Sequence, residues 1–174
     1  LALGDEKQTM EIVDALKAAD YVVSKITRKE TRRKSAPPFT TSTLQQEASR
    51  KLGFTSKRTM TAAQTLYEGV NLPSKGSLGL ITYMRTDSLR ISTVAQNEAR
   101  EYIASTYGDA FLPKTPKQYK AQKSALDAHE AVRPTSAEMS PEKLKDKLKA
   151  DMFKLYRLIW LRFMASQMAD AMVD

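Results

Sequence analysis

The chain has 174 residues, of which 41% are apolar and 28% charged, so it is long and apolar enough to bury a core. Its 28 Lys and Arg against 20 Asp and Glu give a formal charge of +8, which favours a polyanionic partner such as nucleic acid. The absence of cysteine excludes disulfides and thiolate metal sites. Because no stretch approaches the roughly 18 apolar residues of a membrane helix and the first residues lack a signal-peptide pattern, we expect a cytoplasmic protein without a membrane anchor.

Residues 1–34 are predicted to form a separate, β-containing segment. Its first apolar residues follow a helical spacing: Met10, Ile12, Val13 and Leu16. The β-branched run 21–27 then indicates a strand, and the basic run 28–34 interrupts the pattern. We therefore place a boundary near Ser35, with 35–174 as a second, helical domain.

Two short helices open the second domain, each with a serine N-cap and a glycine C-cap: 43–52 between Ser42 and Gly53, and 57–68 between Ser56 and Gly69. Two short helices joined by a tight connection are typical of a helix-turn-helix, which reads DNA in some folds and is only a packing unit in others. Four basic residues near the turn favour phosphate contact, but such a cluster is also typical of a solvated face: Arg50, Lys51, Lys57 and Arg58. Both interpretations stay open.

The rest of the domain is also predicted to be mainly helical. A glycine-rich extended segment, 76–83, precedes a helix over 93–107 that begins at Ser92 or Thr93 and ends at Gly108. An irregular basic connection follows over 113–127, and a helix starts at Pro141. The last helix, 152–169, is apolar over most of its circumference, so we expect it to be largely buried.

Two short stretches carry the chemistry: ITYMRTDS, from Ile81, and AHEAVRPT, from Ala128. In an extended segment alternate side chains share a face, so Tyr83 and Arg85 can point at one substrate group. A phenol with a pKa of about 10 becomes a good nucleophile where positive charge stabilises the phenolate, and a guanidinium can also hold a phosphodiester through two hydrogen bonds. Asp87 could orient Arg85 or His129.

His129 is the only histidine of the chain, and it could hydrogen-bond a phosphate oxygen or assist proton movement. On the residues alone a structural interpretation is at least as good. A lone histidine is more often a structural hydrogen-bonding group, and a lone tyrosine usually fills the edge of a core.

The order of several motifs resembles one family. ITYMRTDS is similar to the active-site segment of bacterial type IA DNA topoisomerases, and AHEAVRPT is similar to their second signature. PPFTTSTLQQEASRKLGF and AAQTLYEG resemble the helical lead-in of the same family. The resemblance runs from about Pro37 to Met168.

The resemblance implies a fold and an activity. The fold would be a mainly α, catabolite-activator-like helix-turn-helix domain over 35–174, with residues 1–34 from the β-rich arch. Tyr83 would attack one DNA strand and form a 5′-phosphotyrosine, Arg85 would hold the scissile phosphate, and His129 would assist. The reaction would relax negative supercoils without ATP. Further DNA contacts are expected from a set of nearby polar residues: Thr86, Asp87, Ser88, Lys123 and Arg133.

The resemblance also implies partners. Family members bind Mg²⁺ in an acidic Toprim domain, and the sequence has no acidic cluster of that type, so we expect no metal ligand here and no activity without that domain. The expected partners are single-stranded or underwound DNA and the remaining domains of the parent topoisomerase, in the bacterial nucleoid.

Two other kinds of protein share some of these features. A tyrosine recombinase or type IB topoisomerase also combines Tyr, Arg and His, but it places the tyrosine after the other two, whereas Tyr83 precedes His129. A non-enzymatic helix-turn-helix DNA-binding module would explain the charge and the two short helices. It gives no reason for a Tyr-x-Arg pair beside a glycine-rich segment.

Overall fold

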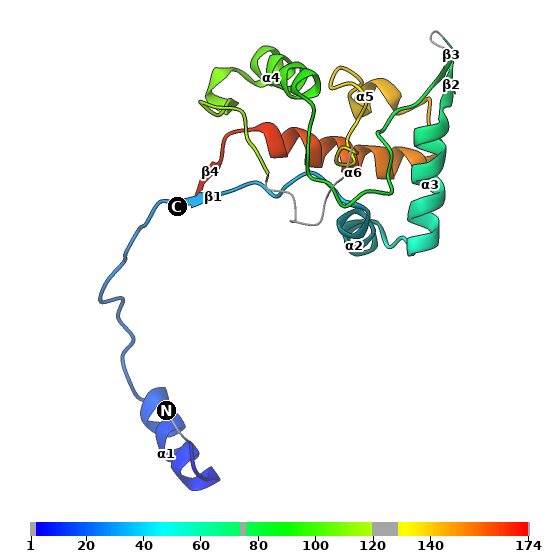
Figure 1. Ribbon diagram of the computed structural model, residues 1–174. Helices are drawn as coiled ribbons and strands as arrows, with labels where there is room; N and C mark the ends of the chain where they lie inside the picture. Colours follow the sequence, from blue (N-terminus) through cyan, green and yellow to red (C-terminus); the bar gives the residue numbers. More distant parts are fainter. Residues whose placement is uncertain (1–2, 74–75, 120–128, 174) are drawn as a thin grey trace. The chain divides into compact units, whose positions relative to one another are not determined.

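The computed structural model describes residues 3–73, 76–119 and 129–173 (Figure 1). The described chain forms two compact units, residues 3–31 and Arg32–Val173. The division lies near the boundary expected at Ser35.

The first unit contains one helix, α1 (Glu6–Lys17). Asp5 caps it, because its side chain accepts a hydrogen bond from the Gln8 amide at 2.7 Å. The strand predicted over 21–27 is wrong for this structure, since these residues are exposed and form no strand. A β-branched sequence still needs a partner strand for its backbone groups, and none of the described residues provides one here.

The second unit is mainly helical, with two short two-stranded sheets. Its elements in chain order are α2 (Thr41–Leu52), α3 (Ser56–Glu68), β2 (Val70–Leu72), β3 (Gly76–Leu78), α4 (Thr93–Tyr107), the 3₁₀ helix η1 (Asp109–Phe111), α5 (Pro141–Leu144), α6 (Ala150–Gln167) and β4 (Ala171–Val173). β2 and β3 pair antiparallel, with Asn71 opposite Ser77. β4 pairs with β1 (Thr31–Arg33), the first strand of the chain. The expectation of a mainly α fold with little β structure is confirmed.

Helix α6 is the centre of the core, and it contacts α2, α3, α4 and α5 (Figure 1). Its buried residues recur on adjacent turns and make a broad apolar face: Leu155, Tyr156, Ile159, Trp160, Phe163 and Met164. Two of them also hydrogen-bond the chain before α5, because Tyr156 Oη donates to the Met139 carbonyl at 2.5 Å and Trp160 Nε1 donates to the Ala137 carbonyl at 3.1 Å. The prediction of a largely buried last helix is confirmed, with its start two residues earlier.

Local capping explains where the other helices begin and end. Gly53 has φ 65°, the left-handed conformation that ends α2, and Ser92 caps α4 by accepting from the Ala95 amide, both as predicted. The predicted N-caps Ser42 and Ser56 are wrong. Thr40 caps α2 through a capping box with Thr43, whose hydroxyl accepts from the Thr40 amide at 2.9 Å, and Thr55 caps α3.

Among the described helices, none is long and apolar enough to cross a membrane. The basic connection predicted over 113–127 has no helix or strand in its described part, 113–119. Residues 120–127 of that prediction lie outside the described residues.

Candidate functional site

The segment 80–86 is held on three sides by backbone hydrogen bonds. The Leu80 amide donates to the Leu66 carbonyl of α3 at 2.7 Å, and the Thr82 amide donates to the Arg133 carbonyl at 2.9 Å. On the far side the Thr41 amide, at the start of α2, donates to the Thr86 carbonyl at 2.8 Å. The segment is therefore fixed to both helices and to the stretch 129–135.

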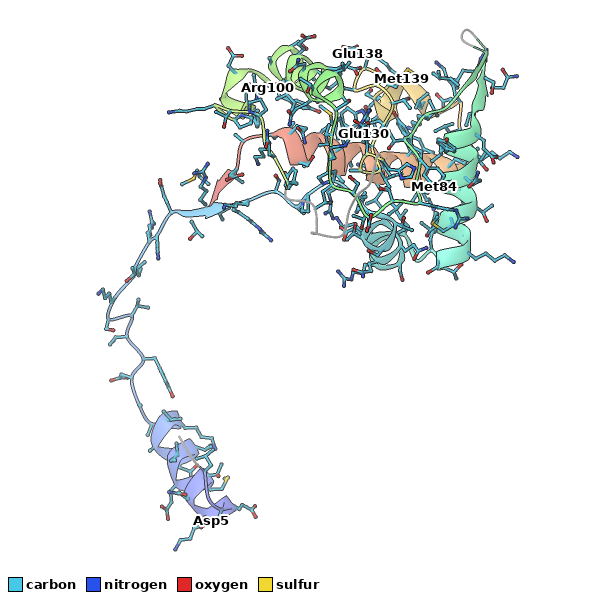
Figure 2. All side chains as sticks on the ribbon, viewed as in Figure 1. Asp5, Met84, Arg100, Glu130, Glu138 and Met139 are labelled. Carbon is cyan, nitrogen blue, oxygen red and sulfur yellow. The ribbon has the colours of Figure 1, made fainter. Side chains whose placement is uncertain are left out.

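Burial alternates along this segment. Met84, labelled in Figure 2, is fully buried, and Thr86 and Ser88 are buried as well. Arg85 and Asp87 are exposed. The backbone bends at Met84 and Arg85, and the alternation leaves the polar, charged residues on the outward side.

Tyr83 is half-buried between two other rings. Its ring centroid lies 5.3 Å from that of Tyr67 on α3, at an interplanar angle of 63°, and 5.3 Å from that of His129, at 38°. Contacts of this kind restrict the orientation of the phenol ring. Within residues 3–73, 76–119 and 129–173, no group hydrogen-bonds the Tyr83 hydroxyl, so this oxygen is not committed to the fold.

Arg85 lies beside α3 and lines a shallow depression with residues of its outer face: Lys57, Met60, Thr61, Gln64 and Thr65. In the described part of the chain its guanidinium has no carboxylate within ion-pair distance. An exposed guanidinium without a carboxylate partner is a site for an external anion. Tyr83 and Arg85 are thus brought to the same helix, α3.

Thr86 and Ser88, expected to contact DNA, have their hydroxyls inside the turn that follows Arg85. The Thr86 hydroxyl accepts from the Ser88 amide at 3.0 Å, and the Ser88 hydroxyl accepts from the Arg90 amide at 3.1 Å. These bonds satisfy amides that would otherwise be unpaired near the core. The two side chains therefore shape the loop that carries Arg85 and Asp87.

Arg133 is paired with Glu130, which is labelled in Figure 2. The Arg133 Nε donates to Glu130 Oε2 at 3.0 Å, and its Nη1 donates to the Pro134 carbonyl at 2.9 Å. The other oxygen of Glu130 accepts from the Ser92 amide, before α4. Only 11% of the Arg133 side chain and 17% of the Glu130 side chain are exposed. The pair ties the stretch 129–135 to the start of α4.

This pairing also sets the charge of Glu130. Partial burial works to raise its pKa, but the hydrogen bonds and charge of Arg133, together with the Ser92 amide, hold the pKa below its usual value. Glu130 is therefore an ionised structural acid.

Two threonines that sequence analysis missed hold the segment 80–86. The Thr41 hydroxyl donates to the Met84 carbonyl at 2.7 Å and accepts from the Thr86 amide at 2.8 Å. The Thr82 hydroxyl donates to the Ala131 carbonyl at 2.7 Å and accepts from the Arg133 amide at 3.0 Å. Thr41 had no local signal, because its partners lie 43 and 45 residues away.

The described residues do not fit a Mg²⁺ site. They contain no group of three His, Cys, Asp or Glu that could hold an ion. Mg²⁺ needs oxygen ligands in octahedral geometry, and near Tyr83 the carboxylate of Glu130 is already occupied by Arg133. Lys123, an expected DNA contact, lies outside the described residues.

Comparisons with known proteins identify the family of this chain. A family model described as DNA topoisomerase matches residues 2–174. The DNA topoisomerase 1 of Rickettsia bellii (strain RML369-C) is 47% identical over 174 residues, covering 99% of this chain and 22% of that protein. The DNA topoisomerase 1 of Rickettsia felis (strain ATCC VR-1525 / URRWXCal2) is 48% identical over 171 residues, covering 98% and 22%.

A solved structure matches as well. Full-length topoisomerase I from Thermotoga maritima superposes with a TM-score of 0.79 at 42% identity, over 93% of this chain and 26% of that chain. This chain thus spans about a quarter of the length of its relatives. The match of the family model over nearly the whole sequence, with ITYMRTDS and AHEAVRPT at one site, means that the chain belongs to the bacterial type IA DNA topoisomerases and corresponds to one part of them.

Proposed function

We propose that this chain is the part of a type IA topoisomerase that supplies the attacking tyrosine. The observation that carries the proposal is the pair formed by Tyr83 and Arg85. The Tyr83 hydroxyl has no hydrogen-bond partner among the described residues, and the exposed Arg85 guanidinium lies two residues further along the chain, beside the same helix.

The proposed step is a transesterification. The Tyr83 oxygen attacks the phosphorus of a DNA phosphodiester, a bond between Tyr83 and the 5′ phosphate forms, and the bond from phosphorus to the 3′ oxygen breaks. The phenol loses its proton and the departing 3′ oxygen gains one. One phosphoester bond replaces another, so resealing by the reverse step needs no ATP, and relaxation of negative supercoils follows from strand passage.

Arg85 would hold the scissile phosphate and stabilise the additional negative charge of the pentacovalent transition state. His129, beside the Tyr83 ring, would bond a phosphate oxygen or assist proton movement. Asp87 is exposed and available for direct contact with DNA. For Thr86, Ser88 and Arg133 the contacts favour an indirect contribution to DNA binding, through the loop and the stretch that they hold. Lys123 stays a proposed DNA contact.

Family membership supports several finer assignments. We propose that α2 and α3 are the helix-turn-helix of a catabolite-activator-like domain, and that residues 1–34 belong to an arch. The rest of the parent protein would provide Mg²⁺ and the acid-base partner, so the 174-residue chain alone would be inactive. Its substrate would be single-stranded or underwound DNA in the nucleoid.

Covalent capture tests the proposal. The chain is mixed with the remaining part of the parent topoisomerase, Mg²⁺ and labelled single-stranded DNA, then denatured, and the DNA-peptide adduct is mapped. We expect an adduct on Tyr83 through a 5′ phosphate, abolished in Tyr83→Phe, which loses the attacking oxygen and keeps the ring contacts. An adduct through a 3′ phosphate would contradict the type IA assignment. No adduct from a folded, reassembled protein would favour a DNA-binding module without activity.

A further inference from the structure

We propose that the outer face of α3, together with Tyr67 near its end, is a binding platform for the single DNA strand that becomes attached to Tyr83. The inference rests on the proposed function and adds to it a strand-holding surface. A strand joined to Tyr83 by one ester bond can rotate about that bond. For resealing, its 5′ phosphate must return to the 3′ hydroxyl in the right orientation, so non-covalent contacts on the same unit are needed.

The platform begins at Arg85 and follows α3. Lys57, Thr61 and Thr65 follow one another at intervals of four residues, and all three line two depressions of the surface. One depression is completed by Arg85, and the other by Lys149 and the first residues of α6. The polar row therefore runs without interruption from the proposed scissile phosphate along the helix.

The charge of this face suits a polyanion. Among the described residues, no carboxylate lies within ion-pair distance of Lys57, Arg85 or Lys149. Arg58 is neutralised by Asp151 through two hydrogen bonds of 2.7 Å. At the far end of α3 the carboxylate of Glu68 accepts a hydrogen bond from the Gln64 amide at 2.5 Å. Positive charge thus prevails at the end near Lys57 and Arg85.

Tyr67 supplies a surface for a base beside the attacking residue. Its side chain is 41% exposed, although its ring packs edge-on against Tyr83 at 5.3 Å. An exposed aromatic ring can bind a single strand, because an unpaired base can stack on it and a base in a duplex cannot. An unpaired strand is therefore the partner that fits both features.

The end of α3 is fixed relative to Tyr83. The Leu80 amide donates to the Leu66 carbonyl, and Gly79 packs so closely that a Cβ there would lie 2.7 Å from the Tyr67 carbonyl oxygen. Tyr67 and Tyr83 are therefore held by one rigid connection. A strand bound on α3 would keep its position relative to the phosphotyrosine.

Binding of a cleaved-strand mimic tests the platform. Fluorescence anisotropy measures the affinity of the 174-residue chain for a 5′-phosphorylated single-stranded octanucleotide and for a dinucleotide, at low salt. We expect the octanucleotide to bind more tightly, and Lys57→Glu to weaken it several-fold and lower the salt slope by about one. The matched control Lys114→Glu makes the same charge change beside Asp170, which follows α6, and should stay within about twofold of the unsubstituted chain.

Substitutions of Tyr67 test the platform without changing the net charge of the chain. Tyr67→Phe keeps the ring and should bind as the unsubstituted chain does, whereas Tyr67→Ala should lose most of the advantage of the octanucleotide over the dinucleotide. Equal affinity of Lys57→Glu and Lys114→Glu, no measurable binding of the octanucleotide, or tighter binding of duplex would each overturn the platform. Adduct formation on Tyr83 in the reassembled protein is measured separately. The binding assay can therefore contradict the platform even where covalent capture supports Tyr83 as the nucleophile.

Discussion

The two motif segments of the site, 81–88 and 129–135, contribute in different ways. The first leaves Arg85 and Asp87 exposed and Tyr83 half-buried, with an uncommitted hydroxyl. The second buries most of its length, and its two charged residues, Glu130 and Arg133, bond each other. Only its ends, His129 and Thr135, are exposed. The charged residues of the second segment thus hold the neighbouring segment in place, whereas those of the first are open to solvent.

The two segments are joined to one another. Ile81 and Pro134 form a β-bridge, and the Thr82 hydroxyl bonds both Ala131 and Arg133. A substitution in 129–135 should therefore shift the position of Tyr83 and measurably lower the free energy of unfolding. A change at Arg85 should alter the reaction and leave stability unchanged.

The largest effect is expected at Arg85. Replacing Arg85 by Ala removes the proposed phosphate ligand, so adduct formation on Tyr83 in the reassembled protein should slow by about 100-fold or more. The free energy of unfolding of the 174-residue chain should change by less than about 0.5 kcal/mol, because the side chain is exposed. Arg85→Lys keeps the charge but lacks the planar guanidinium, so its rate of adduct formation should lie between those of Arg85→Ala and the unsubstituted protein. An unchanged rate in Arg85→Ala would exclude Arg85 from the reaction.

A loss of stability is expected at Arg133. Arg133→Met removes the guanidinium and leaves the largely buried Glu130 carboxylate with only the Ser92 amide, which should lower the free energy of unfolding by about 2–3 kcal/mol in urea titrations. The double variant Glu130→Gln with Arg133→Met should recover part of the loss, since the unpaired charge is gone. If Arg133→Met unfolds like the unsubstituted chain but binds single-stranded DNA less well, Arg133 contacts DNA directly.

The same pair predicts a dependence on pH. Because the pKa of Glu130 is lowered in the folded chain, its ion pair contributes fully above the usual value of 4.5 and is lost as the pH falls through the lowered value. The difference in unfolding free energy between the unsubstituted chain and Glu130→Gln should therefore be constant from pH 8 to about pH 5 and shrink in acid. A difference that grows below pH 5 would contradict this sign.

Local signals in the sequence predicted the helices well. Ser92 and Gly108 adjoin α4, and Gly53 ends α2 in the left-handed conformation, so each boundary depends on residues within one turn. The N-cap of α2 was misplaced because several hydroxyl residues stand side by side, and the capping box between Thr40 and Thr43 decides among them. The strand over 21–27 failed because strand formation depends on a distant partner.

The sequence predicted which residues would form the candidate site but not their contacts. Tyr83, Arg85 and His129 were singled out from motifs, and their catalytic roles stay predictions. The bond from Ser92 to Glu130 spans 38 residues, and nothing in the sequence indicates that the Tyr67 ring packs on Tyr83. Such contacts arise from the packing of α3 and α4 around α6, which local patterns do not determine.

A loss of stability smaller than the one at Arg133 is expected at Thr41, where the coupling between fold and chemistry can be measured. Thr41→Val keeps the shape but leaves the Thr86 amide and the Met84 carbonyl without the hydroxyl, which should cost about 1 kcal/mol of unfolding free energy in urea. Because those two groups flank Arg85, the backbone at Arg85 should be held less firmly, and adduct formation should slow several-fold more than the stability change alone explains. Thr41→Ser restores the hydroxyl and should restore both quantities. If Thr41→Val forms the adduct at the original rate, the reactivity of Tyr83 and Arg85 does not depend on the hydrogen bonds that Thr41 makes to the segment 80–86.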